Sequence, residues 1–140
     1  NLRKIVSSED SPSSKLKKAL KNHLNCFQRY ESELFVWISI EWYKSEFGNE
    51  IAVLGDEIAQ LFHEIMTDGI EKREFREDLD PQLMTFAIFG VYNYMQSWYS
   101  QNAGYNFEQI SRQFNTFVMQ GVLHKNMTYI NGRNARVEND

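Results

Sequence analysis

The sequence is poor in the residues that break helices or cross-link chains. Its 140 residues include two prolines, seven glycines and one cysteine. A single cysteine, Cys26, excludes a disulfide framework within the chain and suits a reducing compartment such as the cytoplasm. Because the sequence offers it no evident base, we expect Cys26 to be a small buried side chain rather than a nucleophile.

Long hydrophobic runs and a positive net charge are also lacking. No stretch approaches the ~20 consecutive apolar residues that a helix needs to cross a membrane, so we expect no membrane span and a cytoplasmic location. With 15 Lys and Arg against 19 Asp and Glu, the formal net charge is −4. This charge argues against binding of nucleic acid by these residues alone, because the phosphate backbone attracts basic surfaces.

The residue patterns of common catalytic and metal sites are absent as well. No two glycines lie close enough for a phosphate-binding loop, and His63-Glu64 lacks the second histidine of a metalloprotease helix. None of the three histidines has a glutamate three residues before it, as a di-iron helical bundle requires. We therefore predict that the chain is not an enzyme and holds no metal and no cofactor.

Apolar residues recur every three or four positions through most of the chain, which is the period of an amphipathic helix. This period predicts a helix that starts at Ser11-Pro12 and further helices over about residues 32–47, 50–73, 80–99 and 106–125. A chain of this length forms one domain with a core of its own. We therefore predict an all-α fold, a bundle of about five helices.

The segment 80–99 is the most apolar of these helices. Asp80 can cap its first turn, and Pro81 fits the first helical position, where no N–H is needed. Apolar residues cover well over half of its circumference, which exceeds the apolar face of an ordinary surface helix. We therefore expect it to be covered from two sides, by the core of its own domain and by a second subunit. The next helix begins at Asn106, with Gln109 completing a capping box.

Large aromatic and sulfur-containing side chains gather on three consecutive predicted helices. Such side chains usually form a core, but several of these carry a polar tip, which suits a cavity for an apolar molecule. The pattern leaves both interpretations open. The candidate ligand-binding residues are Trp37, Trp42, Phe62, His63, Met66, Phe89, Tyr92 and Asn93. His63 is either a histidine at the edge of the core, held by one hydrogen bond, or a polar anchor for a ligand.

A run of basic residues opens the helix after Pro12, namely Lys15, Lys17, Lys18 and Lys21. Such runs are usually solvated helix faces. The alternative is a cationic rim that receives an anionic group of a ligand or lies near a phosphate backbone.

Six segments carry a family resemblance. They are GIEKREFREDLDP at 69–81, FGVYNY at 89–94, WY at 98–99, FEQI at 107–110, FNTF at 114–117 and QGVL at 120–123. Together with the order of the predicted helices, they resemble the C-terminal domain of TetR/AcrR-family transcriptional regulators. The resemblance is closest to the branch that often responds to fatty acids, acyl-CoA thioesters or related lipid-like ligands. Two positions depart from that branch, Arg73, where Gly is usual, and Tyr94, where Trp is usual.

The resemblance implies a homodimer in which the last two long helices, 81–101 and 107–125, form a four-helix bundle with those of a second copy. The interface residues that it suggests are Val91, Met95, Trp98, Phe114, Phe117 and Gly121. Residues 1–6 would end the helix that joins an N-terminal helix-turn-helix domain, which contacts DNA and is missing here. Residues 7–125 would form the ligand-binding and dimerisation domain, and residues 126–140 a polar C-terminal tail.

The function that the resemblance implies is that of an effector sensor in a transcriptional repressor. An apolar or lipid-like ligand, such as a fatty acid or an acyl-CoA, would favour one arrangement of the first four helices. That arrangement would move the linking helix and change the spacing of two DNA-reading heads. Two other functions stay open from the residues themselves. One is a helical module that binds a partner helix in an aromatic groove, and the other is a small-molecule enzyme with an unrecognised site.

Overall fold

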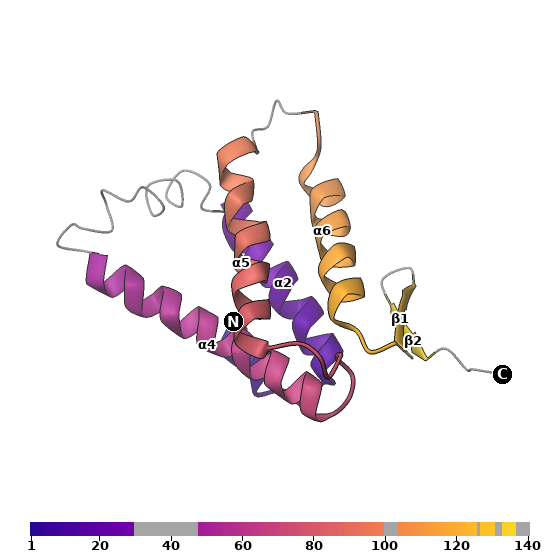
Figure 1. The fold of residues 1–140 in the computed structure, drawn as a ribbon. Helices are drawn as coiled ribbons and strands as arrows, with labels where there is room; N and C mark the ends of the chain where they lie inside the picture. Colours follow the sequence, from indigo (N-terminus) through magenta and orange to yellow (C-terminus); the bar gives the residue numbers. More distant parts are fainter. Residues whose placement is uncertain (30–47, 100–103, 126, 131–132, 137–140) are drawn as a thin grey trace.

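The structure is a computed structural model that describes residues 1–29, 48–99, 104–125, 127–130 and 133–136. Its helices are α1 (Leu2–Val6), α2 (Pro12–Arg29), α4 (Gly48–Glu71), α5 (Pro81–Trp98) and α6 (Phe107–Val122), as Figure 1 shows. The helix expected over 32–47 lies outside the described residues. The predicted bundle of about five helices is confirmed. None of the described helices is long and apolar enough to cross a membrane.

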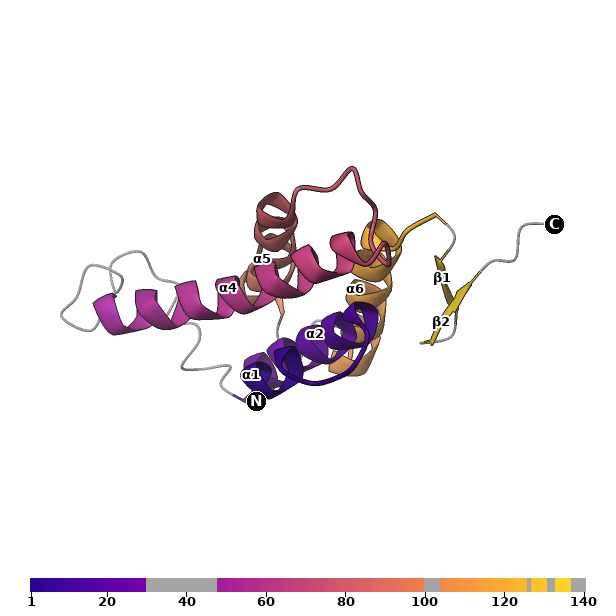
Figure 2. The same ribbon diagram turned by 90° about the horizontal axis from the view of Figure 1, so that it is seen from below.

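The bundle is built around α2, which packs against α1, α4 and α6, while α5 packs against α4 and α6. Figure 2 shows α1 beside α2, with α4 running across the bundle. The fully or nearly fully buried side chains form one core between these helices: Leu16, Leu20 and Leu24 of α2, Phe62, Ile65 and Met66 of α4, Ile88, Tyr92 and Met95 of α5, and Ile110, Val118 and Met119 of α6. Burial of each such side chain contributes about 1.5–3 kcal/mol.

Both predicted helix caps are present. The Asp80 carboxylate accepts a hydrogen bond of 2.8 Å from the backbone N–H of Leu83, and Pro81 occupies the first helical position of α5. At the start of α6, the Asn106 side chain accepts from the N–H of Gln109 at 2.8 Å, and the Gln109 side chain accepts from the N–H of Asn106 at 3.0 Å. This reciprocal pair is the capping box expected from the sequence.

The end of α4 is a Schellman motif with an unusual residue in it. The N–H of Glu74 donates to the carbonyl of Gly69, and the N–H of Arg73 donates to the carbonyl of Ile70, both at 3.0 Å. Arg73 has a φ of 57°, the left-handed conformation in which glycine is preferred. The position at which the resembling regulators usually carry Gly is therefore a position that favours Gly sterically.

The loop after α4 ties three helix ends together. One carboxylate oxygen of Glu74 accepts hydrogen bonds from the N–H (3.0 Å) and the hydroxyl (2.5 Å) of Ser13, at the start of α2. The Glu74 carbonyl accepts from the N–H of His124, and the N–H of Arg76 donates to the carbonyl of Val122, both at 2.9 Å. The buried Phe75 ring lies directly against Gly69.

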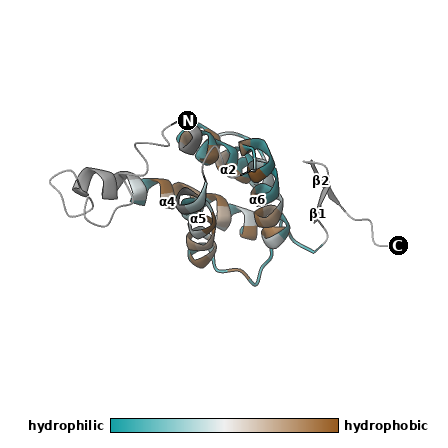
Figure 3. Ribbon diagram, turned by 90° about the horizontal axis from the view of Figure 1, so that it is seen from above, coloured by the Kyte–Doolittle hydropathy of each residue, from teal (hydrophilic) through white to brown (hydrophobic). Residues whose placement is uncertain are grey.

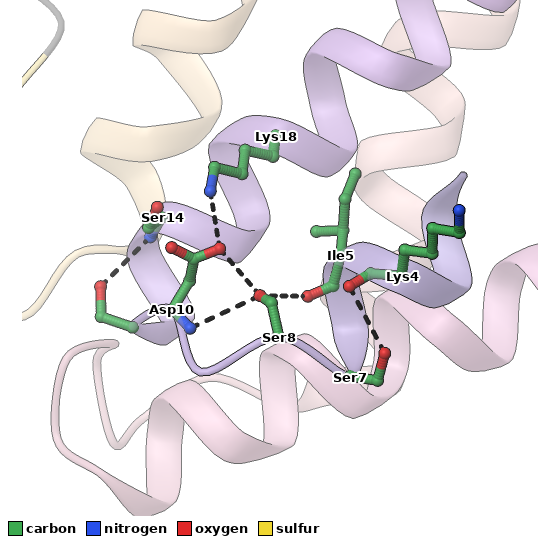
Figure 4. Close-up of polar contacts among 8 residues, drawn as sticks. Lys4, Ile5, Ser7, Ser8, Asp10, Ser14 and Lys18 are labelled. Atoms are coloured by element: carbon green, nitrogen blue, oxygen red, sulfur yellow. Dashed lines mark hydrogen bonds and ion pairs between the residues drawn. The ribbon is translucent and has the colours of Figure 1, made fainter.

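A small polar network closes the connection between α1 and α2, drawn in Figure 4. The Ser8 hydroxyl lies 2.8 Å from both the Ile5 carbonyl oxygen and the Asp10 carboxylate, and Lys18 pairs with Asp10 at 2.6 Å. From the other side, Arg3 of α1 forms an ion pair with Glu57 of α4. The segment expected to end a linking helix is therefore attached to both α2 and α4.

A β-hairpin follows α6, which the sequence reading did not predict. Strands β1 (Met127–Ile130) and β2 (Arg133–Arg136) pair antiparallel, with Met127 opposite Arg136 and Ile130 opposite Arg133. Figure 1 shows it beside the end of α6. Residues 131–132, between the two strands, lie outside the described residues. The range expected to be a polar C-terminal tail contains these paired strands, because backbone hydrogen bonding can form a ladder without an apolar face.

We predict that Gly69→Ala destabilises the domain by about 1–3 kcal/mol, because the added Cβ would overlap the Phe75 ring in a packed interior. Gly55→Ala in the same helix is the matched control, since nothing lies within 4 Å of its added Cβ. That control should be neutral or more stable by up to ~1 kcal/mol through helix propensity. Urea unfolding measures both changes, and equal stability of the two variants would contradict the close contact.

We also predict that Arg73→Gly stabilises the domain by about 1 kcal/mol, since glycine adopts the left-handed conformation without strain. Arg73→Ala is the control, because it keeps the strain and also removes the exposed ion pair between Arg73 and Glu77. Exposed pairs of this kind contribute little. Thermal unfolding should rank the glycine variant above both the alanine variant and the original protein; a glycine variant no more stable than the alanine variant would refute this interpretation.

Candidate functional site

Four rings from three helices form one aromatic cluster in the interior of the bundle. His23 of α2 stacks on Phe89 of α5, with ring centroids 5.6 Å apart and planes 20° apart. Its edges meet Phe62 of α4 at 6.1 Å and Tyr92 of α5 at 5.9 Å. Phe62 and Phe89 also meet edge to face at 5.4 Å. We call these four residues the His23 cluster.

One side of the cluster is buried, and the other side reaches the solvent. Phe62 and Tyr92 are fully buried, whereas His23 and Phe89 are half-buried and the neighbouring Asn93 is exposed. Polar groups therefore stand where the cluster reaches the surface, and the apolar rings lie beneath them. This is the arrangement by which a site orients an apolar molecule with a few polar contacts.

His23 is an uncharged imidazole at neutral pH. Burial lowers the pKa of His23 below its ordinary value of 6.5, and a side-chain hydrogen bond with Asn93 opposes that shift with a smaller effect. A neutral imidazole carries one N–H donor and one ring-nitrogen acceptor. His23 therefore carries one hydrogen-bond donor and one acceptor among the aromatic rings of the cluster.

A second polar link joins the cluster to α6. The Tyr92 hydroxyl donates a hydrogen bond of 2.7 Å to the side-chain oxygen of Asn115. The Tyr92 ring also meets Phe114 edge to face at 5.8 Å, and Phe114 in turn meets Trp98 at 6.1 Å. Continuous ring contacts therefore run from His23 through Tyr92 and Phe114 to Trp98.

The candidate ligand-binding residues fall into four groups. Phe62, Phe89 and Tyr92 meet in the His23 cluster, and Asn93 hydrogen-bonds to its histidine. Met66 is fully buried in the core, so its part in a site stays a prediction. His63 is half-buried and makes no ring contact with the cluster among the described residues. The remaining candidates, Trp37 and Trp42, lie outside the described residues.

The sequence analysis offered His63 as one possible polar anchor and did not select His23. The signal was present, because His23 lies three residues after Leu20 and four before Phe27, on the apolar stripe of α2. A histidine at such a position is enclosed with its apolar neighbours, and Leu20 and Leu24 are buried here.

Large apolar side chains remain exposed on α5 and α6. Tyr94 is 71% exposed and Phe117 is 68% exposed, and both lie on helices that run side by side in Figure 1. In Figure 3, α5 is coloured mainly as hydrophobic, whereas α2 is mixed. We define the α5–α6 face by its exposed residues: Leu83, Phe86, Gly90, Tyr94, Trp98, Phe117 and Gly121. Large apolar side chains that are exposed at helical spacing are typical of interaction surfaces.

Three of the predicted interface residues, Trp98, Phe117 and Gly121, belong to this face. Val91 and Phe114 are half-buried at its edge. Met95 is fully buried in the core of the protomer, so it has no free surface to offer a second chain. The sequence reading did not select Leu83, Phe86 or Tyr94, although they recur at helical spacing on one side of α5.

The basic run after Pro12 lines a second feature. A cavity of about 300 Å³ between α1 and α2 is lined by Asn1, Ile5, Lys18, Lys21, Asn22 and Asn25. Lys18 is already paired with Asp10 across 2.6 Å. Of the four residues in the run, the exposed Lys18 and Lys21 line this hollow, whereas Lys15 and Lys17 are half-buried.

Two further expectations concern reactive groups. Cys26 is exposed, so the expectation that it is a buried side chain is wrong. It stands next to Asn25 on the polar side of α2 rather than on the Leu20 and Leu24 stripe, which explains the exposure. Among the described residues there is no group of three His, Cys, Asp or Glu side chains that could hold a metal ion.

The fold resembles solved transcriptional regulators. The ketosteroid transcriptional regulator KstR2 of Mycobacterium tuberculosis superposes with a TM-score of 0.79 at 18% identity, over 89% of this chain and 64% of that one. A TetR/AcrR-family regulator from Thermobifida fusca YX-ER1 gives 0.74 at 17% identity, over 86% and 63%. This chain thus spans less than two thirds of either protein, and at these identities the likeness shows the fold alone. No curated protein matches the sequence.

The sequence also matches a family over most of its length. Residues 9–122 match the family described as the tetracyclin repressor-like C-terminal domain. This range contains α2, α4, α5 and α6, and with them the His23 cluster and the α5–α6 face. It confirms the resemblance seen in the sequence, and it identifies the domain as regulatory rather than enzymatic. The chain belongs to the tetracyclin repressor-like C-terminal domain family.

Proposed function

We propose that this chain is the effector-sensing and dimerisation domain of a cytoplasmic transcriptional repressor. The observation that carries the proposal is that α5 has apolar contacts to make on two sides. One side holds Phe89 and Tyr92 in the His23 cluster, and the other exposes Leu83, Phe86 and Tyr94 to solvent. An interior aromatic cluster with polar groups suits a small apolar ligand, and an exposed apolar stripe suits a second copy of the chain.

The dimer in this proposal is a four-helix bundle formed by α5 and α6 of two copies. The interface comprises the α5–α6 face, with Val91 and Phe114 at its edge. A twofold interface places the same residues opposite one another, so that the exposed aromatic side chains of one copy cover those of the other. Met95, predicted to take part, supports the face from inside the protomer.

The ligand in this proposal is an apolar or lipid-like molecule, with a fatty acid or an acyl-CoA thioester among the candidates. It binds at the His23 cluster, between α2, α4 and α5. One structural relative is named a ketosteroid transcriptional regulator, and ketosteroids are apolar molecules with fused rings. DNA is contacted by a helix-turn-helix domain on the N-terminal side of residue 1 and not by this domain.

The signal in this proposal travels through α4 to α1. Phe62 of α4 belongs to the His23 cluster, and Glu57, more than one turn earlier in the same helix, pairs with Arg3 of α1. A ligand that binds better to one position of α4 favours the corresponding position of α1. The size of the response equals the difference in its affinity for the two arrangements.

A partner helix, rather than a second copy, is the alternative occupant of the α5–α6 face. The exposed residues on α5 recur at intervals of three and four, which a foreign amphipathic helix can match. In that case the domain would be a protein-interaction module and would be monomeric when purified alone.

Native mass spectrometry of the chain purified from cells, without added ligand, tests the proposal. We expect a dimer of two 16.6 kDa chains that carries an additional few hundred daltons per subunit. A dimer without added mass would support the interface and leave the ligand to the binding experiments below. A bare monomer would contradict the proposal and favour the partner-helix alternative.

We predict that Phe117→Arg weakens the dimer by ~3 kcal/mol or more, since it places unpaired charges in a buried interface. Phe117 is exposed within the protomer, so the fold itself should be unaffected. Gln60→Arg adds the same charge to the exposed side of α4 and is the matched control. Sedimentation velocity over a range of concentrations measures both variants. An unchanged dimer in the Phe117 variant would refute the assignment of this face.

A further inference from the structure

His23 has hydrogen-bonding capacity that the described residues use only in part. Its neutral imidazole has one donor and one acceptor. Within the described part of the chain, Asn93 is the only side chain that forms a hydrogen bond with it. The other neighbours of the ring are Phe62, Phe89 and Tyr92, which meet it through their aromatic faces and edges.

No charged side chain belongs to the His23 cluster. Two basic residues of α2, Lys18 and Lys21, line the hollow against α1. A carboxylate brought to the open edge of the cluster would lose water and gain no counter-charge among the cluster residues, which is costly. An uncharged oxygen would lose less and could accept from, or donate to, the imidazole.

We propose that His23 is the hydrogen-bonding contact for the effector, and that the effector joins an apolar ring or chain to an uncharged oxygen, as in a ketone, an ester, a thioester or an alcohol. The apolar part lies against the half-buried Phe89, and the oxygen lies at the ring nitrogen of His23 that Asn93 does not engage. This inference rests on the proposed function and narrows its ligand class, because a free fatty acid is disfavoured.

Two matched series of probes test the chemical class. The ring series is 2-acetylnaphthalene, 2-ethylnaphthalene and 2-naphthoate, and the chain series is undecan-2-one, undecane and decanoate. Within each series the ketone, the hydrocarbon and the carboxylate are similar in size. For the chain of 140 residues we expect the ketone to bind about tenfold more tightly than the hydrocarbon and the carboxylate, which is the gain from one well-placed hydrogen bond.

His23→Phe keeps a ring that can stack on Phe89 and removes both ring nitrogens. In this variant the ketone should bind no better than the hydrocarbon, whose affinity should change little. His124→Phe is the matched control, because His124 is half-buried at the end of α6, outside the His23 cluster. It should retain the preference for the ketone.

Nitrogen NMR of the original protein gives a test that does not depend on how the variant folds. The chain has three histidines, so the ring signals of His23 can be assigned by comparison with the two others. Addition of 2-acetylnaphthalene should shift the ring nitrogens of His23 more than those of His63 and His124. Addition of 2-ethylnaphthalene should leave the ring nitrogens of His23 with a much smaller shift.

The outcomes separate this inference from the proposed function. Equal binding of ketone and hydrocarbon, or tightest binding of a carboxylate, would overturn the role of His23 while leaving a ligand-binding domain in place. Binding by no member of either series, with no added mass in the native spectrum, would overturn both proposals. Selective ketone binding that survives His23→Phe would assign the contact to another residue and overturn the inference.

Discussion

The arrangement of this domain depends on α5, a helix that carries apolar side chains on two sides and buries those on one side only. Ile88, Tyr92 and Met95 of α5 are buried against the neighbouring helices, while Leu83 and Phe86 on the other side are left in water. Exposed apolar side chains are costly in water, so α5 connects the core of the domain to the surface at which we propose that two copies meet. The His23 cluster and the α5–α6 face are the two results of that constraint.

The loop 72–80 holds the ends of three helices of the bundle in place. Phe75 fills the space that Gly69 leaves free, and Glu74 binds the start of α2 through one carboxylate oxygen. Backbone hydrogen bonds from this loop also reach the end of α6. The start of α2 and the ends of α4 and α6 are therefore held together. The His23 cluster lies further along α2 than this end.

The helices and their ends could be predicted because they depend on neighbouring residues in the sequence. The features that could not be predicted depend on contacts between residues far apart in the sequence. Asp80, Pro81 and Asn106 act on their own first turns, so their roles followed from neighbouring residues alone. The left-handed backbone of Arg73 was visible only as a departure from the family pattern. The enclosure of His23 depends on Phe62 and Phe89, which come from other helices, and no periodicity within α2 reports how closely those rings approach. For the same reason, pattern alone could not separate Met95 in the core from Tyr94 on the surface, one residue away.

Phe114 touches both Tyr92 and Trp98, so it lies next to the His23 cluster and at the edge of the α5–α6 face. If the proposed ligand binding and the proposed self-association are coupled through this ring, the coupling is reciprocal. A ligand that changes self-association by some factor has its own affinity changed by the same factor when the protein associates. The effector concentration to which the protein responds would then depend on the amount of the protein in the cell, and therefore on the expression of its gene.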